Sequence, residues 1–76
     1  MFVVTVFDKQ TEVLVAEYDA EGVEWSSIKS ILKVSDEFPM GEYPLDEEEV
    51  GRLAPFLRGF DQIREGCIYY IGEELR

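Results

Sequence analysis

Hydrophobic residues at the start of the chain are mostly β-branched or aromatic, and they come in two runs separated by a polar turn. Residues 2–7 read FVVTVF and residues 12–18 read EVLVAEY, and both compositions favour β-strands. Between them, Asp8 opens the segment DKQT, and its carboxylate can accept hydrogen bonds from the backbone ahead of it. We therefore predict an antiparallel hairpin, with residues 2–7, the most apolar run, as the central strand of a sheet.

The hydrophobic spacing changes to that of a helix after the break at residues 19–22, DAEG. The apolar residues that then recur on one helical face are Trp25, Ile28, Ile31 and Leu32. We expect this first helix to end near Val34. Residues 35–44 contain two prolines and a glycine, so a loop is predicted there.

A capping pattern marks the start of a second helix. Asp46 is a favourable N-cap residue, and Glu49, three positions later, completes a capping box. Leu45 and Val50 occupy the positions of a hydrophobic staple. We expect this helix to bury one apolar stripe, made of Val50, Leu53, Ala54 and Leu57.

Pro55 interrupts the second helix, because it cannot donate a backbone hydrogen bond and its ring crowds the preceding turn. We expect the helix to kink or stop near residue 54, and a short turn can resume at residues 55–58 with Pro55 as its first residue. In that case Phe56 can replace Leu57 in the core. Residues 67–73, CIYYIGE, alternate in the manner of a strand and predict the third strand of the sheet.

These elements follow the order strand, strand, helix, helix, strand. The simplest packing is an α+β fold in which both helices cover one face of a three-stranded antiparallel sheet. Residues 1–76 are expected to form one domain, because a chain of this length supplies a single modest core. A core of that size leaves a thin stability margin of roughly 3–5 kcal/mol.

Composition adds an acidic surface to this picture. Hydrophobic residues make up 46% of the chain, which is too many for a disordered acidic tail. The seventeen acids and seven bases give a net charge of −10. This charge opposes binding to nucleic acid and to anionic membranes and favours a basic partner; acidity that only serves solubility is the alternative. The amino terminus has neither a basic leader nor an apolar run long enough to span a membrane, so a cytoplasmic protein is expected.

The residue types present argue against catalysis. The chain has no histidine and a single cysteine, Cys67, which removes the commonest general base and any zinc site built from cysteine or histidine. Cys67 lies in an apolar run, where a buried structural thiol is expected. No phosphate-binding glycine motif occurs, so we predict no enzyme activity, no catalytic residues and no cofactor. The acids that could form a calcium site lack the spacing of an EF-hand loop, so no metal is predicted; they are Asp36, Glu37, Glu42 and Asp46.

The strongest candidate for a binding surface is the acidic segment between Val34 and Gly51. It carries seven acids and no base, with aromatic residues set among the acids. Apolar anchors inside a ring of charge are typical of an interface that meets a basic protein. The predicted partner-binding residues are Asp36, Glu37, Phe38, Glu42, Tyr43, Asp46, Glu47 and Glu48. Two structural alternatives stay open, since a loop aromatic can pack into the core and first-turn glutamates suit the helix dipole.

Three stretches carry a resemblance to a known class of proteins: FDKQTEVLVAEYD, EYPLDEEEVGRLAPFL and CIYYIGEEL. They resemble small acidic immunity proteins of bacterial toxin–immunity pairs, as in contact-dependent inhibition, bacteriocin and type VI secretion systems. The resemblance implies a non-catalytic cytoplasmic protein that binds a cognate toxin domain, often a basic nuclease, and blocks it. It supplies no catalytic residues.

Two other functions fit the same residues. A nucleic-acid mimic would inhibit a DNA-binding protein by placing carboxylates along a ridge, as phosphates lie along DNA. A structural or accessory module would form a homodimer through the third strand or through exposed aromatic residues, and the sequence leaves the oligomeric state open. Direct binding to nucleic acid is not expected, because the seven bases do not cluster in the sequence.

Overall fold

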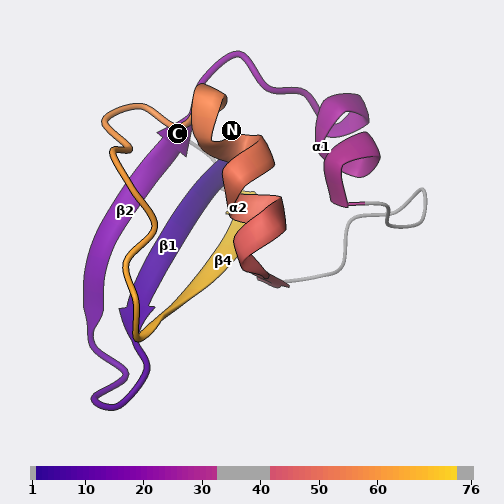
Figure 1. Cartoon of the computed structure of the whole chain (residues 1–76). Helices are drawn as coiled ribbons and strands as arrows, with labels where there is room; N and C mark the ends of the chain where they lie inside the picture. The colour runs from indigo at the N-terminus through magenta and orange to yellow at the C-terminus, as the bar shows by residue number, and fades with distance from the viewer. Residues whose placement is uncertain (1, 33–41, 74–76) are drawn as a thin grey trace.

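An antiparallel sheet with helices on one face organises the chain (Figure 1). The computed structural model describes residues 2–32 and 42–73. The strands are β1 (Phe2–Asp8), β2 (Leu14–Ala20), β3 (Tyr43–Leu45) and β4 (Cys67–Glu73), and the helices are α1 (Trp25–Leu32), α2 (Glu47–Leu53) and the short 3₁₀ helix η1 (Ala54–Phe56). The sheet order is β2-β1-β4-β3, with every neighbouring pair antiparallel. The α+β class, the hairpin and the central position of the first strand are therefore confirmed.

The sheet has four strands, not the predicted three, because part of the predicted loop is β3. Tyr43, Pro44 and Leu45 pair with Ile71, Tyr70 and Tyr69 of β4. A strand of this length is too short to show an alternating pattern, and the proline lacks a donor for a sheet ladder. Proline is tolerated here because β3 lies at the edge of the sheet, where one side of the strand needs no partner. The predicted helix end at Val34 and residues 35–41 of the predicted loop lie outside the described residues.

The β1–β2 pairing contains a bulge that the alternating pattern did not predict. Val6 pairs with Ala16, but Phe7 pairs with Leu14, so the register skips Val15. Paired residues of neighbouring strands share a face of the sheet. Leu14 therefore lies on the face of Phe7, opposite to the face that simple alternation with Ala16 predicts.

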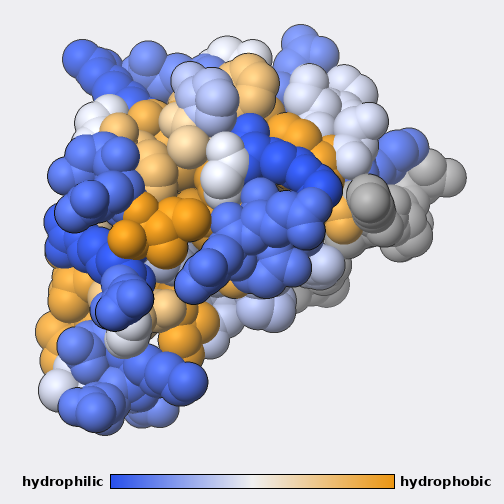
Figure 2. Space-filling view, viewed as in Figure 1, coloured by the Kyte–Doolittle hydropathy of each residue, from blue (hydrophilic) through white to orange (hydrophobic). Residues whose placement is uncertain are grey.

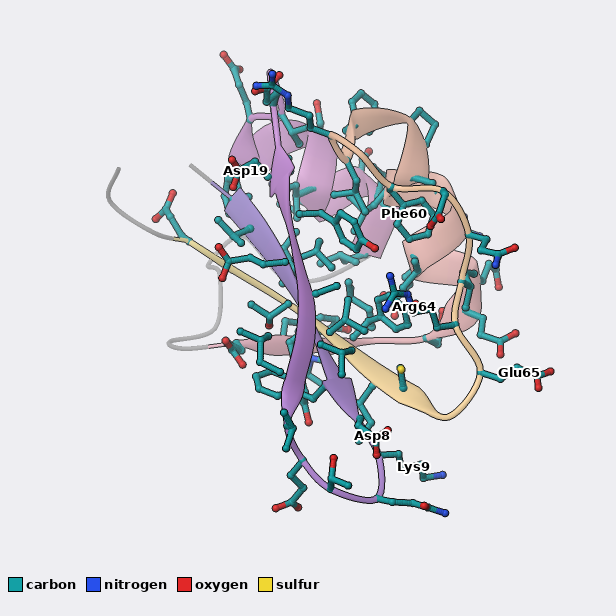
Figure 3. The ribbon with its side chains drawn as sticks, turned by 90° about the vertical axis from the view of Figure 1, so that its left-hand side faces the viewer. Asp8, Lys9, Asp19, Phe60, Arg64 and Glu65 are labelled. Atoms are coloured by element: carbon teal, nitrogen blue, oxygen red, sulfur yellow. The ribbon has the colours of Figure 1, made fainter. Side chains whose placement is uncertain are left out.

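The core lies between the sheet and the helices. Figure 3 views the sheet along the β2 edge and shows the helices on one side of it, as predicted. The buried cluster takes alternate residues from the strands and the apolar stripes of α1 and α2; its members are Phe2, Val4, Val6, Ala20, Ile28, Leu32, Leu45, Val50, Leu53, Leu57, Tyr69 and Ile71. We call the opposite face of the sheet, which none of the described helices covers, the far face.

The prediction for the carboxyl end of α2 is correct about where the helix stops but wrong about which residue after it enters the core. The helix ends at Leu53, and Pro55 stands in the first turn of η1. Leu57 is only 5% exposed, whereas Phe56 is 40% exposed, so the expectation that Phe56 replaces Leu57 in the core is wrong. The reason is a backbone pairing beyond η1: Leu57 forms a bridge with Ala20 at the end of β2, and the Glu21 amide donates to the Phe56 carbonyl at 3.1 Å. This pairing holds the Leu57 side chain inward.

The capping box at the start of α2 gives a first testable prediction. The Glu49 amide donates to Asp46 Oδ1 at 2.8 Å, and the Asp46 amide donates to Glu49 Oε1 at 3.0 Å. Asp46→Ala removes the first of these bonds, and we expect it to lower the free energy of unfolding by about 1 kcal/mol. Urea denaturation measures this loss. Asp46→Asn is the matched control because it keeps the acceptor oxygen; an alanine variant as stable as wild type would contradict a structural role for the cap.

Candidate functional site

The predicted partner-binding residues do not form one surface in the described structure. Asp36, Glu37 and Phe38 lie outside the described residues. Glu42 is exposed and lies just before β3, where Thr5 Oγ1 donates to its Oε1 at 3.5 Å. Thr5 pairs with Tyr70, and both side chains alternate with core residues, so this contact places the Glu42 carboxylate over the far face.

Tyr43 takes the opposite direction from Glu42. It is half-buried and packs against the hydrophobic core on the helical side of the sheet. The alternative in which a loop aromatic packs into the core therefore describes Tyr43. It leaves the Tyr43 ring less accessible than an exposed anchor would be.

The remaining predicted acids gather at the start of α2. Asp46 is occupied by the capping box, while Glu47 and Glu48 are exposed in the first turn. Glu48 forms an ion pair with Arg52, one turn later. Arg52 Nη1 also donates to the Ile31 carbonyl at 3.3 Å, which ties α2 to α1. Glu47 and Glu48 thus present their charge on the helical side of the molecule, away from Glu42.

The far face carries a groove that the sequence interpretation did not single out. It has a volume of about 480 Å³ and is lined by Phe7, Asp8, Glu12, Glu42, Ile68 and Tyr70. Phe7 pairs with Ile68 across β1 and β4, and the rings of Phe7 and Tyr70 meet edge to face with their centroids 5.8 Å apart. The sequence did contain a sign of this groove. Residues 2–7 are apolar on both faces, and Ile68 and Tyr70 lie on the face of the last strand opposite the core.

Exposed apolar residues lie at the start of β2, directly after the hairpin turn. Val13, Leu14 and Val15 are 58%, 49% and 41% exposed. Figure 2, which views the molecule from the helical side, shows apolar side chains at the lower left, over the start of β2. The bulge turns Leu14 onto the far face beside Phe7, so one of these exposed residues lies next to a residue that lines the groove.

The hairpin turn fixes the position of the Asp8 carboxylate at one end of the groove. Its Oδ1 accepts hydrogen bonds from the amides of Gln10 at 2.9 Å and Thr11 at 3.0 Å. The Thr11 and Gln10 amides hold the pKa of Asp8 below its usual value, because they stabilise the charged carboxylate. Asp8 is therefore ionised at neutral pH. This turn confirms the predicted role of Asp8 in bonding the backbone ahead of it.

Glu12 adopts a backbone conformation that glutamate rarely takes. Its φ angle is +61°, in the left-handed region. The turn imposes this angle, since the Glu12 amide donates to the Asp8 carbonyl at 2.8 Å and the Asp8 amide donates to the Val13 carbonyl at 2.9 Å. The sequence places here a residue that the backbone disfavours, and its side chain lines the groove.

Replacing Glu12 with a residue suited to this angle should stabilise the protein. Asparagine tolerates the left-handed region far better than glutamate does. We expect Glu12→Asn to raise the free energy of unfolding by about 0.5–1 kcal/mol, measured by urea denaturation. Glu12→Gln keeps the strain and serves as the matched control. A Glu12→Asn variant less stable than Glu12→Gln would show that the turn does not impose this strain.

The described residues contain no group of three or more histidine, cysteine, aspartate or glutamate side chains arranged to hold a metal ion. The carboxylates of Asp8, Glu12 and Glu42 thus border the groove without converging on one point.

Cys67 is a half-buried free thiol that packs against the core. Within residues 2–32 and 42–73, no helix has the length and apolar character needed to cross a membrane.

Comparison with known proteins places the chain in a family. No curated protein and no solved structure gave a match. The profile of a domain of unknown function, DUF7683, matches residues 1–72. These residues include every described helix and every described strand except the last residue of β4, so the family corresponds to the whole fold. The chain belongs to the family of domains of unknown function called DUF7683.

Proposed function

We propose that this chain is a non-catalytic, cytoplasmic inhibitor that binds a basic protein, and specifically an immunity protein that neutralises a cognate toxin domain such as a nuclease. The observation that carries the proposal is the surplus of exposed carboxylates. Asp46 and Glu49 satisfy the helix start, yet Glu47 and Glu48 add further exposed charge beside them. Glu42 adds a third exposed carboxylate that no capping role requires.

Electrostatics favours this partner class. A nuclease must attract the phosphate backbone of its substrate, so its active-site surface is basic. A small domain with a net charge of −10 is attracted to such a surface over long range and competes with the nucleic acid for it. Association of this kind is fast and salt-sensitive, because much of the attraction is between exposed charges.

The alternative functions are less well supported. A nucleic-acid mimic needs its carboxylates along one ridge, whereas Glu42 lies over the far face and Glu47 and Glu48 lie on the helical side. A homodimer through the strand at residues 67–73 is disfavoured, because β4 is an interior strand that pairs with β1 on one side and, along residues 69–71, with β3 on the other. The favoured proposal requires neither a single ridge of charge nor a free edge on β4.

The test uses the gene beside the one that encodes this chain. Its product is expressed in a bacterial host alone, with this chain, and with an unrelated acidic domain of similar size as control. We expect growth arrest in the first and third cultures and growth in the second, together with co-purification of the two proteins. A toxic product that neither binds this chain nor is neutralised by it would refute the proposed immunity function.

A further inference from the structure

We propose that the far-face groove binds a short, extended, basic segment of a protein partner. An apolar side chain of that segment would sit over Phe7 and Tyr70, and flanking lysine or arginine side chains would reach the carboxylates at the ends of the groove. This inference rests on the proposed function, because it describes the segment with which the proposed basic partner would contact this chain. It concerns a surface distinct from the acidic start of α2.

The floor of the groove supplies an apolar contact. Phe7, Ile68 and Tyr70 are half-buried although none of the described helices covers this face of the sheet. The edge-to-face packing of Phe7 and Tyr70 fixes both rings. A rigid aromatic floor beside the exposed Leu14 gains from being removed from water, since the apolar area is already ordered before binding.

The ends of the groove supply negative charge. Asp8 and Glu12 project from the hairpin, and Glu42 lies on the side nearest β3. Among the described residues that line the groove there is no lysine or arginine. Asp8 uses Oδ1 for the turn, and Glu42 has a single long contact at 3.5 Å with Thr5, so both retain acceptor capacity for a cationic side chain.

The width of the groove indicates an extended segment. It crosses from β1 over β4 to the residue that precedes β3, which is two strand spacings or about 10 Å. An extended chain covers this distance in about three residues. Neighbouring side chains of an extended chain alternate in direction, so the apolar residue faces the aromatic floor while the long side chains of the two flanking basic residues bend toward the carboxylates at the ends.

A second copy of this chain is a poor occupant by the same reasoning. Two grooves placed face to face would bring together the carboxylates of Asp8, Glu12 and Glu42 from each copy, on molecules that each carry a net charge of −10. Like charges brought together at an interface are strongly unfavourable. Charge complementarity thus selects a basic partner over self-association.

The strained backbone at Glu12 is a second reason to assign a role to this groove. Residues held in disfavoured conformations gather at functional sites, where the surrounding structure maintains them. Glu12 has a φ of +61° where asparagine or glycine would fit better, and its side chain lines the groove. A glutamate kept at this position supplies a carboxylate at the expense of stability.

The test uses short fluorescent peptides as probes of the groove. One alternates lysine with leucine, a second alternates lysine with serine, and a third alternates glutamate with leucine. Fluorescence anisotropy should show that the lysine–leucine peptide binds about tenfold more tightly than either of the others. Amide NMR signals should shift at Phe7, Glu12, Ile68 and Tyr70 and remain unchanged over α2.

Variants of the groove complete the test. Tyr70→Ser should weaken binding of the lysine–leucine peptide about tenfold, and Glu12→Asn should weaken it about threefold. Because Glu12→Asn is expected to fold more stably than wild type, its weaker binding cannot come from unfolding. Glu65→Gln is the matched control, since Glu65 is exposed and points away from the sheet on the helical side (Figure 3).

Three results would overturn the inference. They are equal binding of the lysine–leucine and lysine–serine peptides, NMR shifts confined to α2, and equal affinities of the Glu12→Asn and Glu65→Gln variants. Failure of the proposed function is a separate outcome. If Glu47→Gln with Glu48→Gln abolishes binding of the toxin domain while the groove variants bind normally, the immunity function stands and the groove assignment fails. If the groove binds the lysine–leucine peptide selectively but the chain inhibits no toxin, the groove assignment stands and the immunity function fails.

Discussion

Replacing Glu42, Glu47 and Glu48 together with lysine is expected to weaken binding of the proposed basic partner by about a hundredfold or more. Each replacement adds two positive charges, so the net charge changes from −10 to −4. The change falls on exposed positions of both acidic surfaces, the groove and the start of α2. Attraction therefore becomes local repulsion at both, which slows association and shortens the lifetime of the complex. Surface plasmon resonance measures both rate constants.

Controls separate lost charge from lost stability. Lysine in the first turn of α2 opposes the helix dipole at about 0.3–1 kcal/mol per residue, and Glu48→Lys also removes the ion pair with Arg52. A triple glutamine variant avoids the reversed charge and should weaken binding less, but in the same direction. Lysine at three other exposed acids, Asp61, Glu65 and Glu73, gives the same net charge and should retain more affinity. If both lysine variants bind equally, net charge alone acts and the predicted surfaces are wrong.

Leu53→Ala should bring the protein close to unfolding. Leu53 has no exposed surface and belongs to the cluster that joins α2 to the sheet. Truncating a buried leucine costs about 3 kcal/mol, while the whole domain has a margin of roughly 3–5 kcal/mol. Urea denaturation at low temperature and a thermal scan followed by circular dichroism should both show this loss.

The matched control for this prediction is Leu14→Ala. It deletes the same atoms from a residue that is 49% exposed, so its effect should stay within about 0.5 kcal/mol. Similar losses for Leu14→Ala and Leu53→Ala would contradict the described core. The Leu14 variant also bears on the groove, because Leu14 lies beside Phe7 on the far face.

Features fixed by local interactions were predicted correctly from the sequence. The capping box of Asp46 and Glu49 and the helix stop before Pro55 each depend on residues within one turn. The runs at residues 2–7, 12–18 and 67–73 were recognised as strands because each is long enough to show the composition of a β-strand. The start of β2 at Leu14 instead of residue 12 reflects the length of the Asp8 turn.

Features that depend on pairing between distant residues were missed. Tyr43–Leu45 became a strand only because β4 offers an edge to pair with. Leu57 stays in the core because the following backbone joins the end of β2. Leu14 changed face because of a bulge, which moves a side chain without altering the hydrophobic pattern.

The candidate site shows the same division. The sequence identified the acidic character of the segment around Glu42, but the direction of each side chain depends on β3. Pairing of β3 with β4 turns Tyr43 toward the core, while Glu42 reaches Thr5 on the far face. The groove combines residues of β1, the hairpin and β4 with Glu42. No local motif brings these positions together, so only the folded sheet could reveal it.

The most direct test of the account is the affinity for the proposed toxin partner, sought as the product of the neighbouring gene, measured by isothermal titration calorimetry over a series of salt concentrations. The account predicts a tight complex at low salt and an affinity that falls steeply as salt rises, because exposed carboxylates provide much of the attraction. It also predicts that the variant with lysine at Glu42, Glu47 and Glu48 binds weakly at every salt concentration. A tight complex whose affinity depends neither on salt nor on these three residues would contradict it.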